Sequence, residues 1–150
     1  MKSIQILCAL LLTVAVANAS FVCPKPCGAN DICVMIDSNC KVLPWWSCQE
    51  VTMGVRMVGQ WNDSVNNCIY SQWEVTITNH LPRKITNLFI ATDDSLTLRD
   101  NSSIWNMAKN GNILSLPTYQ PSVNPSSSYT FGFIIKGTHQ PHMVIKAVTY

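Results

Sequence analysis

Charged side chains are scarce in this sequence of 150 residues, which contains ten Lys and Arg and eight Asp and Glu. Its only adjacent basic pair is Arg83-Lys84. Nucleic-acid binding requires clustered Lys and Arg, so we expect no nucleic-acid partner. The recognition surface should instead be neutral and built from aromatic, amide and hydroxyl groups, which suits neutral sugars.

Patterns typical of enzymes and metal sites are also lacking. The sequence has no Gly-x-Ser-x-Gly motif, and Asp93-Asp94 is better interpreted as a turn than as a catalytic carboxylate pair. His139-x2-His142 would need a third ligand, such as His80, for a metal site. Copper oxygenases that attack cellulose hold their metal with an N-terminal His, which the predicted mature chain lacks. We expect no catalysis, no cofactor and no metal.

The first 19 residues have the pattern of a secretory signal peptide. Lys2 precedes the apolar run Ile4 to Val16, and Ala17-Asn18-Ala19 forms a cleavage site. The alternative, a transmembrane anchor, needs about 20 apolar residues, and this run is shorter. No apolar run of membrane length follows it. We predict a mature chain that begins at Ser20, is secreted and extracellular, and does not contact a membrane.

Cysteine usage agrees with secretion. Of seven Cys, Cys8 leaves with the signal peptide, and an even number remains, which is typical of disulfides. A zinc site would favour Cys-x2-Cys spacing, which is absent. The predicted disulfide cysteines are Cys23, Cys27, Cys33, Cys40, Cys48 and Cys68.

The pairing of these cysteines stays open. Cys68 is expected near a hairpin tip, about 20 to 30 Å from Cys48 at 3.3 Å per residue. A direct bond between them would need a sharp bend at Gly54 or Gly59. The alternatives are that both pair with the N-terminal segment, or that Cys68 pairs with another chain.

The mature chain divides by composition near Cys48. Residues 20–47 form a Cys-rich segment whose Pro, Gly, Asn and Asp residues break long periodic elements. Residues 48–150 alternate apolar and polar residues between turn signals, without a helical stripe. We predict an all-β fold, an antiparallel two-sheet β-sandwich, with strands at Val51–Val58, Ile69–Asn79, Ile85–Ala91, Ser95–Leu98, Ile113–Leu116, Tyr129–Lys136 and Met143–Thr149.

One core face follows from this alternation. In Ile69–Asn79, Ile69 and Trp73 point one way, and Tyr70 and Gln72 point the other. The predicted core is Val51, Met53, Trp73, Val75, Ile77, Leu88, Ile90, Phe131, Phe133, Ile145 and either Ala147 or Val148.

Several segments from Trp61 onward resemble the family 49 carbohydrate-binding module, a cellulose-binding domain. They are Trp61-Asn62, Tyr70 to Asn79, Leu88-Phe89-Ile90, Ile104-Trp105-Asn106, Leu116-Pro117, Tyr129 to Gly132 and Val148-Thr149-Tyr150. The versions in secreted cellulose-coat and sheath proteins of social amoebae are the most similar. The Cys23 to Cys40 spacing more loosely resembles a follistatin-like or dictyostelid Cys-rich module. The resemblance implies cellulose or a related β-glucan as partner.

The candidate carbohydrate-binding residues are Trp61, Tyr70, Trp105, Tyr119 and Gln72. Trp61 lies in an Asn/Asp/Ser-rich turn and matches the family's binding Trp, although its parity with Val51 also allows a place in the core. Tyr70 should point to solvent or to the Cys-rich segment. Trp105 and Tyr119 match positions where the family carries aromatics, or instead plug the core under a loop.

Two further features bear on partners. At least one of Trp45-Trp46 should be exposed, because adjacent residues of an extended chain face opposite ways. Asn62 and Asn101 begin glycosylation sequons. The sequence therefore favours a wall or matrix protein that docks on cellulose and contacts other coat proteins. The alternative is a secreted protein-binding module, an inhibitor or ligand, that acts through the Cys-rich segment.

Overall fold

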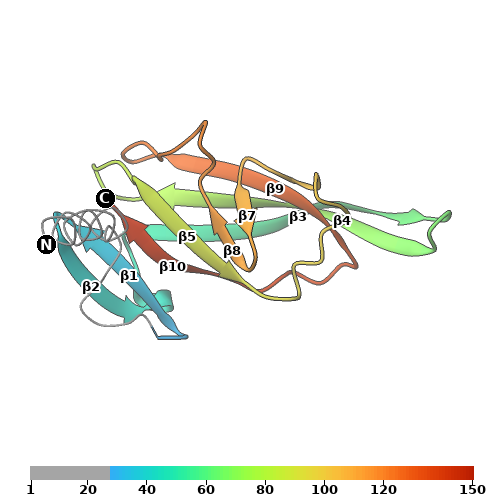
Figure 1. Cartoon of the computed structure of the whole chain (residues 1–150), viewed down its shortest axis with the longest axis horizontal. Coiled ribbons are helices and arrows are strands. Elements are labelled where there is room, and N and C mark those ends of the chain that lie inside the picture. The colour runs from blue at the N-terminus through green and yellow to red at the C-terminus, as the bar shows by residue number, and fades with distance from the viewer. Residues whose placement is uncertain (1–27) are drawn as a thin grey trace, which may run out of the picture.

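Residues 28–150 of the computed structural model are described, and they form two stacked β-sheets (Figure 1). The predicted signal peptide, Ser20, Cys23 and Cys27 lie outside the described residues. Among residues 28–150, no helix has the length and apolar character that a membrane span requires. The elements are β1 Asp31–Ile36, β2 Asn39–Pro44, η1 Trp45–Ser47, β3 Val51–Asp63, β4 Cys68–Asn79, β5 Asn87–Thr92, β6 Ile104–Trp105, β7 Ala108–Asn110, β8 Ile113–Ser115, β9 Ser128–Lys136 and β10 Met143–Thr149.

The two sheets confirm the predicted sandwich. Sheet A has six strands in the order β2-β1-β10-β5-β8-β7, and sheet B has four in the order β3-β4-β9-β6. All pairings are antiparallel except β1 with β10, which is parallel. In Figure 1 the far end of the β3–β4 hairpin extends beyond the other strands.

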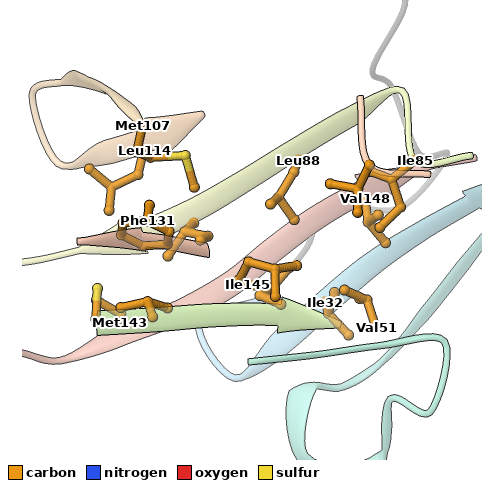
Figure 2. Close-up of a cluster of buried hydrophobic side chains, with 14 of the residues drawn as sticks. Ile32, Val51, Ile85, Leu88, Met107, Leu114, Phe131, Met143, Ile145 and Val148 are labelled. Carbon is orange, nitrogen blue, oxygen red and sulfur yellow. The ribbon is translucent and has the colours of Figure 1, made fainter. Parts of the chain in front are cut away.

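The core lies between the sheets and is filled by alternate residues of both (Figure 2). Every predicted core residue is buried except Met53, which is half-buried, and Ala147. Val148 is buried instead of Ala147 because the pairing of β10 with β5 shifts by one residue between Ile145 and Ala147. Such a β-bulge changes which residues face inward.

Two strands lie before Cys48, in a segment whose Pro, Gly, Asn and Asp residues predicted no long periodic element. β1 pairs with β10 and with β2, so residues 31–44 extend sheet A. The composition change near Cys48 therefore does not separate two sheets. Conversely, Ser95–Leu98 is not a strand, and within residues 28–150 its one bridge joins Leu98 to Ile135.

The β3–β4 hairpin is longer than expected because its turn begins after Asp63. The Asp63 carboxylate accepts hydrogen bonds from the backbone N–H groups of Val65 and Asn66, at 3.0 and 3.2 Å. These bonds hold the turn together. The pairing then shifts between Met57 and Gly59, where Val58 is the extra residue of a bulge.

The cysteines fall into two groups. Cys33 and Cys40 each take part in a disulfide bond. Cys48 and Cys68 carry free thiols, so the expectation that both are bonded to the N-terminal segment is wrong. Cys68 pairs in register with Asp63 at the hairpin tip, and Cys48 lies before the opposite end of β3. The length of β3 keeps the two thiols apart.

The two free thiols should react at different rates. Burial raises the pKa of the Cys48 thiol, whereas Cys68 is partly exposed. We expect iodoacetamide to modify Cys68 faster than Cys48 in the native protein at pH 8, because only an accessible thiolate reacts. Peptide mass spectrometry over time measures both rates, and the rates should become similar in denaturant. Modification of Cys48 as fast as Cys68 under native conditions would contradict the structure.

Candidate functional site

The face of sheet B that points away from sheet A is lined by the residues that alternate with the core residues. We call it the outer face of sheet B. Strand register assigns its members, because directly paired residues share a face. They are Thr52, Gly54, Arg56, Gly59 and Trp61 on β3, Tyr70, Gln72, Glu74, Thr76 and Thr78 on β4, Ser128, Thr130, Gly132, Ile134 and Lys136 on β9, and Trp105 on β6.

Trp61 belongs to this face because of the bulge in β3. Before the bulge, Val51, Met53 and Met57 pair with core-facing residues of β4. After it, Trp61 pairs with Tyr70, which has the opposite orientation. The Trp61 side chain is 39% exposed and does not cap the core. A count of alternation from Val51 gives the wrong face, because the bulge adds one residue.

Tyr70 points away from Trp73, as expected, but it is only 6% exposed. The expectation that it faces solvent is therefore wrong. Tyr70 lies on an inner strand of the sheet, between Trp61 on β3 and Lys136 on β9. The centroids of the Trp61 and Tyr70 rings are 6.1 Å apart. Tyr70 thus supports the Trp61 ring from below the surface more than it offers a face of its own.

Gln72 is the next outer-face residue after Tyr70 on β4, and its side chain is half-buried. Its partner on β3 is Gly59, around which no atom lies within 4 Å of the place where a Cβ would be. The Gln72 amide therefore has open space on one side. It is positioned to offer hydrogen bonds next to Trp61.

Trp105 lies on the short strand β6, directly opposite Gly132 of β9. A Cβ at Gly132 would overlap the indole of Trp105, so the ring lies directly against the glycine backbone. Trp105 is 38% exposed. It is therefore neither free in a loop nor a plug of the core.

Tyr119 joins this end of the surface through Asn106. Asn106 has φ +59°, and its backbone carbonyl accepts a hydrogen bond from Tyr129 Oη at 2.6 Å. Its side-chain Oδ1 lies 3.5 Å from Tyr119 Oη. Tyr119 is 71% exposed. Asn106 thus holds the chain turned directly after Trp105 and brings Tyr119 near it.

The outer face therefore carries the aromatic pair Trp61 and Tyr70 and, separately, the indole of Trp105, and Tyr119 adjoins the face through its contact with Asn106. Strand spacings of about 4.8 Å and 3.3 Å per residue separate Trp61 from Trp105 by about 20 Å. Polar pairs lie between and beside them, including Arg56 with Glu74, Thr76 with Thr130, and Thr78 with Ser128. The surface combines apolar ring faces with hydroxyl, amide and ion-paired groups. Such a surface can contact the apolar faces and hydroxyls of sugar rings.

Trp45 and Trp46 lie elsewhere, in η1, and are 49% and 64% exposed. Their ring centroids are 5.8 Å apart with the planes nearly perpendicular. They border a cavity of about 200 Å³ at the edge of the sandwich. Its lining is apolar apart from Thr52, and consists of Ile32, Trp45, Trp46, Cys48, Val51, Thr52, Met53, Met143, Val144 and Ile145.

The histidines do not form a site. His142 Nδ1 lies 3.4 Å from Asp93 Oδ2, and His80 Nε2 lies 2.8 Å from Thr52 Oγ1. Within residues 28–150, no three His, Cys, Asp or Glu side chains are grouped as metal ligands would be.

Comparison with known proteins identifies the family. The model of the carbohydrate binding domain CBM49 matches residues 51–137, which include the whole of sheet B. The chain belongs to this family. It is therefore a carbohydrate-binding protein, and the match contains all four strands that carry the outer face, β3, β4, β6 and β9.

Individual relatives extend the similarity. The CBM49 protein is 44% identical to "Stalk-specific protein A" and 43% identical to "Stalk-specific protein B" of Dictyostelium discoideum, over 100% of each chain. Among solved structures, chitinase ChiA74 from Bacillus thuringiensis is similar with a TM-score of 0.47 and 18% identity. That alignment covers 63% of this chain and 15% of the chitinase.

The sequence patterns did not indicate that Arg56, Glu74, Gly132 and Asn106 contribute to the outer face of sheet B or to its border. One signal was available, because a glycine inside a strand often marks a close approach of another group. Gly132 lies between Phe131 and Phe133 in such a strand. The positive φ of Asn106 has no comparable sequence signal beyond the tolerance of Asn for that conformation.

The backbone at Asn106 gives a prediction of stability. Asn106→Ala and Asn106→Gly both remove the side-chain hydrogen bonds, but only Ala is strained at positive φ. We expect Asn106→Ala to be less stable than Asn106→Gly by about 1 kcal/mol. Urea unfolding measures the difference. At the exposed strand residue Asn87 the order should reverse, because Gly weakens a strand. Equal or greater stability of Asn106→Ala would contradict the assigned backbone.

Proposed function

We propose that the outer face of sheet B binds cellulose or a related β-glucan, without catalysis. The observation that supports this most is the placement of two half-exposed indoles, Trp61 and Trp105, on one face with few charged groups, within the CBM49 match. Tyr119 lies 3.5 Å from the side chain of Asn106, the residue that follows the second indole in the chain. Four of the five residues that the sequence predicted, Trp61, Tyr70, Gln72 and Trp105, share this face, and Tyr119 adjoins it.

The physics of such binding is hydrophobic contact with defined geometry. Each aromatic ring that covers about 100 Å² of apolar sugar surface contributes about 2.5 kcal/mol before losses. Association itself has an unfavourable free energy of several kcal/mol. One exposed Trp is therefore insufficient, whereas two Trp with Tyr119, at about 7.5 kcal/mol before losses, and a hydrogen bond from Gln72 leave a net attraction of about 4 kcal/mol, which corresponds to roughly millimolar binding. Tyr70 contributes by holding the Trp61 ring.

The location that suits this activity is a wall, coat or matrix outside the cell. The signal-peptide pattern of residues 1–19 and the names of the two stalk-specific relatives support it. In this proposal the protein is secreted and acts as a component of a polysaccharide matrix. Other coat proteins are its proposed protein partners.

Asn62 and Asn101 are proposed glycosylation sites, and both are exposed. Asn62 pairs with Ile69 and not with Tyr70, so it points to the face of the hairpin opposite Trp61. A glycan on Asn62 would extend away from the outer face of sheet B. Occupancy and sugar binding are therefore compatible. Mass spectrometry before and after peptide-N-glycosidase treatment identifies an occupied site.

A second candidate function is protein binding through the segment before β3. The apolar cavity beside Trp45 and Trp46 favours it, because an exposed apolar recess suits the side chain of a protein partner. This segment precedes the CBM49 match. The two functions use different surfaces and can be tested separately.

Binding to microcrystalline cellulose tests the proposed function. We expect Trp61→Ala and Trp105→Ala each to weaken binding by about tenfold, and the double variant to abolish it, because each indole supplies apolar contact area. Depletion isotherms on cellulose measure the change, and thermal unfolding checks that each variant is folded.

Trp46→Ala is the matched control, because Trp46 is more exposed than either indole but lies in η1, outside sheet B. It should bind cellulose like the unchanged protein. Loss of binding in Trp46→Ala, with full binding in the Trp61→Ala/Trp105→Ala variant, would place the sugar site at the cavity instead.

A further inference from the structure

One row of residues crosses the outer face of sheet B from the β3 edge to Trp105. Arg56 pairs with Glu74, Glu74 with Gly132, and Gly132 with Trp105. Neighbouring strands are about 4.8 Å apart, so the row spans about 15 Å. It brings an ion pair and an indole side by side, with only a glycine between them.

Gly132 determines where the indole lies. A Cβ at this position would overlap Cζ2, Cε2 and Nε1 of Trp105. The ring therefore extends over the Gly132 backbone toward β4, the strand that carries Glu74. Any larger residue at 132 would displace the ring from the sheet.

The Glu74 carboxylate is held in place by Arg56. The Nε and Nη2 atoms of Arg56 lie 3.0 and 2.7 Å from Glu74 Oε1. Both contacts use the same oxygen, and within residues 28–150 no group donates a hydrogen bond to Oε2. The Glu74 side chain is 35% exposed. A fixed carboxylate oxygen is thus accessible beside the indole.

We propose that Arg56, Glu74, Gly132 and Trp105 form a sugar subsite. A pyranose ring stacks on the exposed side of Trp105, and one of its hydroxyl groups donates a hydrogen bond to Oε2 of Glu74. Arg56 positions Glu74 and cancels its charge, so the subsite suits a neutral sugar. Gly132 is a positioning residue that acts through Trp105. This inference rests on the proposed function, because it assigns a subsite on the same surface.

Calorimetric titration with cellohexaose tests the subsite. We expect Glu74→Gln to weaken binding by about tenfold, because it replaces a hydrogen bond to a charged acceptor with a weaker neutral one. Asp37→Asn is the matched control. Asp37 also pairs with an arginine, Arg83, but lies in the turn between β1 and β2. Its binding should equal that of the unchanged protein.

Gly132→Ala should weaken binding about as much as Trp105→Ala does. In the Trp105→Ala background, the same glycine substitution should have no further effect on binding, because its target ring is gone. A purely structural role of Gly132 would lower affinity in both backgrounds. Thermal unfolding shows whether Gly132→Ala is folded. If it is not, the affinity of Glu74→Gln for cellohexaose is the test of the subsite.

The outcomes separate the subsite from the proposed function. If the unchanged protein binds cellohexaose and Trp61→Ala weakens that binding, but folded Glu74→Gln binds normally, the subsite is wrong and the proposed function stands. If Gly132→Ala weakens binding equally with and without Trp105, the positioning role is wrong. If the unchanged protein binds neither cellulose nor cellohexaose, the proposed function itself fails.

Discussion

The bulge in β3 is the constraint on which the make-up of the outer face of sheet B depends. Val58 is one residue more than the pairing with β4 needs, and it reverses the alternation of every later residue in the strand. Without it, Trp61 would lie on the same side as Val51 and Met57. The bulge thus places the odd-numbered residues of β3 on the core side before Val58 and on the outer face after it.

The rest of the surface follows from the difference between edge and inner strands. Trp61 and Trp105 lie on the two edge strands of sheet B and keep part of each ring exposed. Tyr70 lies on the inner strand β4, has neighbours on both sides and is buried; burial raises the pKa of its phenol. Polar and ion-paired residues occupy the centre of the face. The arrangement places one indole at each edge of the sheet and mainly hydrogen-bonding groups on the two inner strands.

Much of the fold was predictable because strand alternation marks buried faces directly. Trp73, Val75 and Ile77 alternate without interruption, and the structure buries all three. β1 and β2 were missed because their Cys, Asn and Asp residues are typical of loops, whereas β1 gains its stability from pairing with the distant β10. No local pattern records such a long-range pairing.

The candidate site was predictable in its residue types but not in its geometry. The family resemblance selected Trp61, Trp105 and Tyr119, and their exposure agrees with a surface role. The burial of Tyr70 depends on the neighbouring strands β3 and β9, and the place of Trp105 depends on Gly132, 27 positions later in the chain. These are tertiary relations between segments that are distant in sequence.

The most direct measurement is a nuclear magnetic resonance titration that follows the indole N–H signals of the five Trp residues while cellohexaose is added. If the outer face of sheet B binds the sugar, the signals of Trp61 and Trp105 move together with the same dissociation constant, while those of Trp45, Trp46 and the buried Trp73 stay in place. Movement of the Trp45 and Trp46 signals, with Trp61 and Trp105 unchanged, would contradict a site on this face.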